Sequence, residues 1–157
     1  MKTYRIESVM HIYEMAELNE EDKALVEAAK QATSGSYAPY SKFNVGAAVR
    51  LQNGGIIVGA NQENAAFPSG LCAERTALFA AGAQYPDVPV STLAIAARGT
   101  DGELLSEPCS PCGSCRQVII ESETRAKHPI RILLYGRRCI YVIDGIRQIM
   151  PLMFSEF

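Results

Sequence analysis

Four residues in two short segments combine types and spacing that suit metal-assisted chemistry. Cys72 is followed two residues later by Glu74, and Cys112 and Cys115 stand three residues apart in a second segment. Two cysteines at this spacing at the start of a helix both face one ion, and the helix dipole favours their thiolate forms. A third thiolate, from Cys72, would leave tetrahedral zinc one open position, which is the arrangement of a catalytic site.

Glu74 is placed to serve that open position without binding the ion. Zinc lowers the pKa of a water molecule in such a position toward neutrality. A carboxylate two residues after a ligand can take a proton from the water and pass it to a leaving amine. The combination of both segments matches the pattern of zinc-dependent deaminases. We therefore predict a hydrolytic enzyme that uses one Zn²⁺ per chain.

Each segment alone also fits other kinds of site. Redox motifs and structural zinc sites use the same C-x-x-C spacing, and a structural site could take Cys109 as a fourth ligand. Because residues 108–112 also read P-C-x-x-C, the ligand pair has two possible registers, Cys109 with Cys112 or Cys112 with Cys115. A glutamate near a helix start is more often a partner of the helix dipole than a catalyst. The occurrence of both segments in one chain favours catalysis.

Composition indicates a single domain over residues 1–157 and excludes some partners. The chain is 48% hydrophobic and 20% charged, with a net charge of −2. This balance argues against nucleic-acid binding, which needs a basic surface. The apolar stretches are too short to span a membrane, and the N-terminus lacks the apolar core of a signal peptide. We expect a cytoplasmic protein whose cysteines form no disulfides.

The surrounding elements predict an α/β fold. We expect a helix capped by Asn19 and ended by Gly35, and a hairpin of strands 45–51 and 56–60 that turns at Asn53-Gly54. Helices over 72–84, 112–122 and 145–150 and strands over 92–97, 131–135 and 139–142 complete the list. This order predicts a mixed five-stranded sheet in a three-layer α-β-α sandwich, with the chemistry at helix starts. Residues 1–18 form an N-terminal extension with a possible extra strand within 2–13.

The sequence resembles the small, homotetrameric class of cytidine deaminases, from about residue 19 to residue 154. The resemblance rests on APYSKF at 38–43, VGAA at 45–48, NQENA at 61–65, CAERT at 72–76 and PCGSCRQV at 111–118. The glycine and the RQV of the last segment fit the second register. The resemblance therefore implies Cys72, Cys112 and Cys115 as zinc ligands and Glu74 as the catalytic residue, with Cys109 a bystander.

The resemblance also implies how a substrate is held. Asn61 and Glu63 would bind the ribose hydroxyls, Phe43 would form an apolar wall of the pyrimidine pocket, and the Ala73 backbone would read the polar edge of the base. Phe154 resembles the family aromatic that enters a neighbouring subunit's site and stacks on the base. A homotetramer with shared active sites is therefore expected.

Arg75 can offset the negative charge of the ligand thiolates beside the metal. Three thiolates on a dication leave a net charge of minus one, which weakens the pull of the ion on water. An arginine that donates hydrogen bonds to the ligand sulfurs withdraws that excess charge. The alternative for Arg75 is a surface salt bridge, and the resemblance favours the role beside the sulfurs.

The expected reaction converts cytidine and 2′-deoxycytidine to uridine and 2′-deoxyuridine with release of ammonia, a step of pyrimidine salvage. Few lysines and arginines flank the motifs, which argues against a nucleotide substrate. One alternative is deamination of a related aminonucleoside such as blasticidin S. Another is a non-catalytic module with a structural zinc, in which Glu74 would have no role. A thiol redox function is disfavoured, because a proline-flanked cysteine pair fits zinc better.

Overall fold

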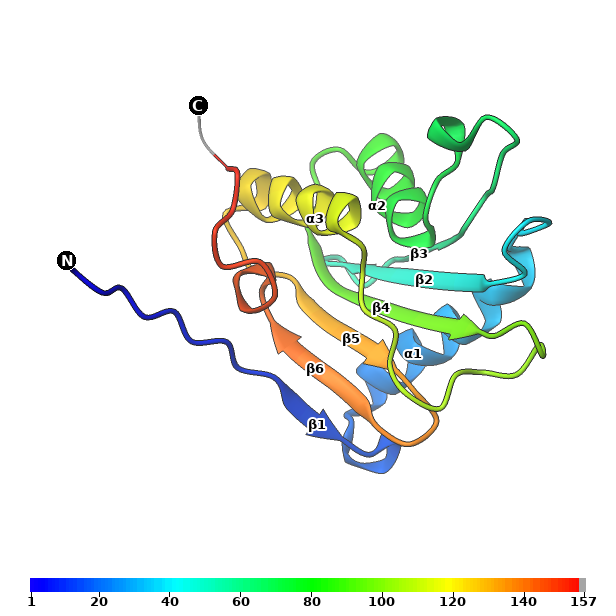
Figure 1. Ribbon diagram of the computed structural model, residues 1–157, viewed down its shortest axis with the longest axis horizontal. Helices are drawn as coiled ribbons and strands as arrows, with labels where there is room; N and C mark the ends of the chain where they lie inside the picture. Colours follow the sequence, from blue (N-terminus) through cyan, green and yellow to red (C-terminus); the bar gives the residue numbers. More distant parts are fainter. Residues whose placement is uncertain (156–157) are drawn as a thin grey trace.

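The computed structural model describes residues 1–155, and its six strands form one mixed sheet in the order β1-β6-β5-β4-β2-β3 (Figure 1). The strands are β1 (His11–Tyr13), β2 (Asn44–Leu51), β3 (Ile56–Ala60), β4 (Val90–Arg98), β5 (Arg131–Tyr135) and β6 (Ile140–Asp144). The helices are α1 (Glu20–Ala32), α2 (Ala73–Gln84) and α3 (Gly113–Ala126). Strands β4 and β5 run parallel, and the other neighbouring pairs run antiparallel. The predicted α/β class with a mixed sheet is confirmed.

The helices cover both faces of the sheet. Leu25 and Val26 of α1 pack in one apolar core with β2, β4, β5 and β6. Leu78 of α2 and Ile119 of α3 belong to a second core on the opposite face. Figure 1 shows α2 and α3 side by side on one side of the sheet and α1 on the other. The three-layer α-β-α sandwich is therefore confirmed. No helix within residues 1–155 has the length and apolar character that crossing a membrane requires.

The sheet has six strands instead of the predicted five, because His11–Tyr13 pairs with β6. The possible extra strand is present but is confined to these three residues, and residues 1–10 form no regular element. His11 pairs with Val142, and β6 ends only two residues after Val142, at Asp144. Gly145, with a φ of 89°, then turns the chain away. Residues before His11 consequently have little of β6 left to pair with.

A glycine in β3 allows α2 to lie directly on the sheet. A Cβ atom on Gly59 would lie 2.5 Å from the backbone nitrogen of Ala77 and 2.7 Å from the carbonyl oxygen of Ala73. Both distances are shorter than ordinary van der Waals contact. Ala73 is the first residue of α2, so the absence of a side chain at Gly59 sets the position of the helix start that follows Cys72.

Replacing Gly59 by alanine is expected to push α2 away from β3 and to lower the stability of the fold. Overpacking of this kind costs about 1–3 kcal/mol, or about 2–4 °C in melting temperature for each kcal/mol. Thermal unfolding followed by circular dichroism measures the change. Gly82→Ala in the same helix is the matched control, because its Cβ would approach only Arg125 Nη1, at 3.9 Å. There the better helix propensity of alanine should raise the melting temperature. An unchanged melting temperature for Gly59→Ala would contradict this account of the packing.

Candidate metal and substrate site

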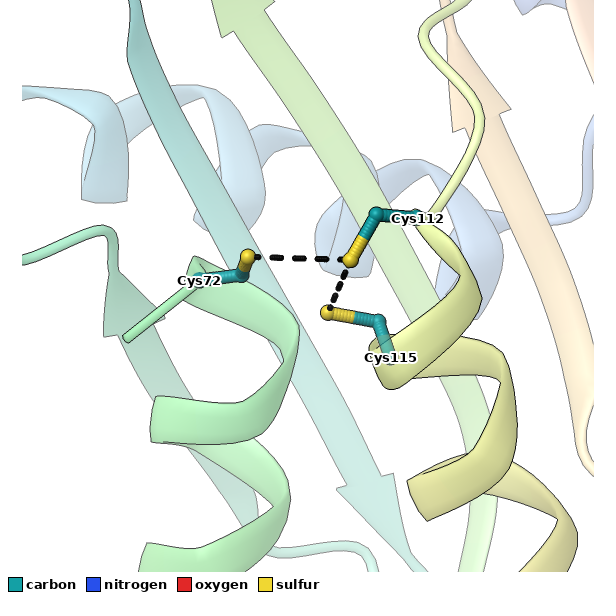
Figure 2. A group of neighbouring side chains, drawn as sticks. All are labelled: Cys72, Cys112 and Cys115. Atoms are coloured by element: carbon teal, nitrogen blue, oxygen red, sulfur yellow. Dashed lines mark hydrogen bonds between the residues drawn. The ribbon is translucent and has the colours of Figure 1, made fainter. Parts of the chain in front are cut away.

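Three cysteines meet where α2 and α3 begin (Figure 2). Cys72 is the N-cap residue of α2, Cys112 is the N-cap residue of α3, and Cys115 lies in the first turn of α3. Their Sγ atoms all lie within 4.8 Å of one another, with 3.8 Å between Cys72 and Cys112 and 3.5 Å between Cys112 and Cys115. In neither case does the N-cap side chain accept a hydrogen bond from a backbone N–H of its own helix. The three sulfurs are therefore available to one ion.

The spacing of the sulfurs fits tetrahedral zinc. With Zn–S bonds of about 2.3 Å, tetrahedral geometry places two sulfurs about 3.8 Å apart. The two measured distances, 3.8 and 3.5 Å, agree with this value. Within the described residues, Cys109 is not among the cysteines that converge. The register of Cys112 with Cys115 is thus the one that the fold brings to Cys72.

The surroundings of Cys72 favour its thiolate form. The nearby Cys115 thiol lowers the pKa of Cys72 to about 5, and Arg75 and Cys112 act in the same direction. The same contact raises the pKa of Cys115. The N-terminal ends of two helices add further favourable potential for anions. For Cys109, by contrast, burial raises the pKa, which keeps this thiol protonated.

The first turn of α2 places two further charged groups at the cluster. Arg75 Nη2 donates to Cys72 Sγ at 3.5 Å, which is the contact predicted for this arginine. Glu74 is only 5% exposed, and this burial, together with the negative charge of Cys72, raises the pKa of its carboxyl group. A buried group that can hold a proton therefore lies two residues from the first cysteine.

A cavity of about 520 Å³ opens beside Cys72 and Arg75. This volume is typical of small-molecule sites. Asn61 and Glu63, which follow β3, line its wall, as expected for substrate-binding residues. The cavity also adjoins Tyr40 and Phe67, two exposed aromatic side chains whose rings meet edge to face, with 5.9 Å between centroids. These two rings are 27 positions apart in the sequence, so their pairing could not be predicted from it.

Glu63 is held in place by backbone groups of the loop before β2. Its Oε2 accepts hydrogen bonds from the N–H groups of Tyr40, at 2.9 Å, and Ser41, at 3.2 Å. Hydrogen bonding from Ser41, followed by that from Tyr40, lowers the pKa of Glu63, which therefore stays ionised near neutral pH. Both backbone hydrogen bonds go to Oε2.

Asn61 connects the cavity to the same loop. Its Oδ1 accepts from Ser36 Oγ at 2.5 Å and from Val45 N–H at 2.8 Å, and its Nδ2 donates to the Phe43 carbonyl at 2.9 Å. An amide group can make four hydrogen bonds, and three are used here. Within residues 1–155 the second N–H of the Asn61 amide is left for a ligand, so the residue both organises the loop and lines the cavity.

The remaining predicted substrate residues lie outside the lining of this cavity. Ala73 is fully buried at the start of α2, and Phe43 is half-buried in the loop before β2. Phe154 lies in the carboxyl-terminal segment with 65% of its surface exposed, and its carbonyl accepts a hydrogen bond from Gln117 Nε2 at 2.8 Å. The fold thus brings Asn61 and Glu63 to the cysteine cluster within one chain, but it leaves the Phe154 ring at the surface.

Comparisons with known proteins agree with this geometry. The family model described as "Cytidine and deoxycytidylate deaminase zinc-binding region" matches residues 19–128. A cytidine deaminase of Halalkalibacterium halodurans is 45% identical over 97 residues, which cover 62% of this chain and 68% of that protein. One of Mycobacterium tuberculosis is 39% identical over 106 residues, covering 66% and 74% of the two chains.

The fold has a counterpart among solved structures. The crystal structure of a cytidine deaminase from Burkholderia pseudomallei superposes with a TM-score of 0.70 at 37% sequence identity. The match covers 83% of this chain and 97% of that one. The match leaves a larger share of this chain unmatched than of the solved chain. Nearly all of the solved domain therefore has a counterpart here.

Proposed function

The chain belongs to the family of cytidine and deoxycytidylate deaminases that share a zinc-binding region, and on this premise we propose that it hydrolytically deaminates cytidine and 2′-deoxycytidine. The products are uridine, or 2′-deoxyuridine, and ammonia. The observation that carries the proposal is the convergence of three cysteine sulfurs, a buried glutamate and a nucleoside-sized cavity at the start of α2.

Cys72, Cys112 and Cys115 would hold the zinc ion, one per chain. When bound there, zinc supplies a Lewis acid that makes water nucleophilic at neutral pH. Glu74 takes a proton from the attacking water on its carboxylate and delivers it to the exocyclic amine, which leaves as ammonia. Arg75 donates to the Cys72 sulfur and so reduces the negative charge that three thiolates place on the site.

The cavity accounts for recognition of a nucleoside. Glu63 offers carboxylate acceptors and Asn61 an amide N–H, a complementary set for the hydroxyls of a ribose. We assign the Ala73 backbone to the polar edge of the base, because it adjoins Cys72. Phe43 is assigned to the wall of the pyrimidine pocket, because its carbonyl is bound to Asn61.

A direct assay tests the proposed reaction. Zinc-loaded protein is incubated with cytidine, 2′-deoxycytidine, cytosine, deoxycytidylate and blasticidin S, and the loss of cytosine absorbance is followed. We expect turnover of the two nucleosides and little of the free base or the nucleotide. Zinc-loaded protein that deaminates neither nucleoside would contradict the proposal. Turnover of blasticidin S alone would identify the aminonucleoside alternative.

The active unit is proposed to be a homotetramer with shared active sites, acting in pyrimidine salvage in the cytoplasm. Its support is the exposed ring of Phe154, together with exposed Tyr40 and Phe67, which line the cavity. Large aromatic side chains left at the surface are commonly buried in contacts between subunits. In this arrangement Phe154 of one subunit stacks on the base in the site of its neighbour.

Replacing Phe154 by alanine is expected to raise KM for cytidine about 5- to 150-fold, since stacking of an aromatic side chain on a base contributes about 1–3 kcal/mol. Zinc content and melting temperature should not change. Leu152→Ala is the matched control, because this side chain is also apolar and exposed in the same segment. Sedimentation velocity should show a tetramer for both variants. A fully active monomer would refute the shared site.

A further inference from the structure

Two consecutive side chains of α3 hold the carboxyl-terminal segment, residues 149–154, against the start of that helix. Arg116 Nη1 donates to the Ile149 carbonyl at 2.6 Å, and Gln117 Nε2 donates to the Phe154 carbonyl at 2.8 Å. The two bonds therefore tie both ends of the segment. Arg116 and Gln117 directly follow Cys115, so the attachment lies within one helical turn of the cysteine cluster.

Arg116 also binds the segment that leads into Cys112. Its Nε donates to the Pro111 carbonyl at 3.0 Å, and Pro111 immediately precedes Cys112. One half-buried guanidinium thus connects the turn that carries Cys112 to the carboxyl-terminal segment. Such planar, multiply donating geometry is specific to arginine.

Packing and local backbone hydrogen bonds hold mainly the start of the segment. Ile149, Met150 and Met153 are partly buried against the core, and the N–H groups of Ile149 and Met150 donate to the Ile146 carbonyl. Leu152 and Phe154, by contrast, are 81% and 65% exposed. Beyond Met150, where most side chains are exposed, the backbone keeps much of its freedom unless hydrogen bonds restrict it. The bonds from Arg116 and Gln117 restrict the segment at the carbonyls of Ile149 and Phe154.

We propose that Arg116 and Gln117 are positioning residues that hold residues 149–154 in the conformation from which Phe154 reaches the substrate. This inference rests on the proposed function, in which the Phe154 ring stacks on the base. Neither side chain touches the substrate. Losing either hydrogen bond leaves the chemistry intact. Substrate binding must then order the segment, and the entropic cost of that ordering raises KM.

A double-mutant cycle tests the inference. Gln117→Met removes the donor at constant side-chain length and should raise KM for cytidine about three- to tenfold, as for the loss of one hydrogen bond. Turnover should stay within about twofold and zinc at one per chain. In a Phe154→Ala background the same substitution should change KM by less than about twofold, because Gln117 affects the substrate only through the position of the Phe154 ring. Gln31→Met, at an exposed position of α1, is the matched control.

Amide hydrogen exchange provides a readout that does not depend on activity. Gln117→Met and Arg116→Met should both speed exchange in residues 149–154, while Arg116→Lys, which keeps one donor, should have an intermediate effect. Equal rises of KM in both backgrounds, loss of zinc from Gln117→Met, or unchanged exchange in both variants would overturn the inference. If the parent protein deaminated no cytosine nucleoside, the proposed function would fail. Exchange alone would then decide: faster exchange supports the attachment of the segment, and unchanged exchange overturns it.

Discussion

Glu74→Gln is expected to lower kcat by at least about 10²–10⁴-fold, while the zinc content remains at one per chain. Glutamine has the size and shape of glutamate, but its amide cannot take a proton from water and deliver it to the leaving amine. Glu74 is 5% exposed, and burial raises the pKa of its carboxyl group, so the ionised form is destabilised by its surroundings. The neutral glutamine should therefore leave the melting temperature unchanged or raise it.

The measurements are kcat and KM for cytidine, zinc content by atomic emission, and thermal unfolding. Glu121→Gln is the control, because Glu121 is an exposed glutamate of α3. A zinc-loaded Glu74→Gln protein with near-normal turnover would eliminate Glu74 as the proton carrier. Loss of zinc from this variant would instead give Glu74 a role in binding the metal.

Cys112→Ser should weaken zinc binding by roughly 10²–10³-fold and abolish activity. A structural zinc site contributes roughly 10–16 kcal/mol, which is shared among four ligands. The Cys112 sulfur lies 3.8 Å from that of Cys72 and 3.5 Å from that of Cys115, so its replacement removes one of three converging ligands. Zinc content after dialysis against a chelator, and competition with a zinc-binding dye, measure the change.

Cys109→Ser is the control for this substitution and decides between the two registers of the motif. Cys109 lies outside the group of converging cysteines in residues 1–155, and burial raises the pKa of its thiol. Its replacement should leave zinc content and kcat unchanged. If Cys109→Ser removed the metal and Cys112→Ser kept it, the ligand assignment would be wrong.

Several elements of the fold could be predicted because their signals are local. Strands 56–60 and 131–135 have the predicted bounds, since apolar β-formers are flanked there by turn residues. Asn19 caps α1 as expected, with its side chain accepting from the Asp22 N–H at 2.8 Å. The starts of α2 and α3 lie one residue after Cys72 and Cys112, so the cysteines predicted at helix starts are N-cap residues.

Other features depend on contacts distant in the sequence and could not be predicted. Helix α3 continues to Ala126, four residues past its predicted end, and Glu123 in its last turns accepts from the N–H groups of Ile130 and Ile146. The predicted helix over 145–150 is a 3₁₀ turn of three residues. The attachment of residues 149–154 likewise joins side chains and carbonyls more than 30 positions apart.

By itself the sequence determined which chemistry the chain carries, because the spacing of Cys112 from Cys115 and of Cys72 from Glu74 acts within a single helical turn. Residue spacing left two registers of the cysteine pair open, and the tertiary structure shows that Cys112 and Cys115 converge with Cys72. Cys72 and Cys112 are 40 positions apart, and their sulfurs meet because α2 and α3 pack on the same face of the sheet. That packing follows from Gly59, which lets α2 approach β3, and from the buried Ile119 of α3. Helical periodicity specifies which residues share one face of a helix, whereas the distance between two helices is set by the side chains packed between them.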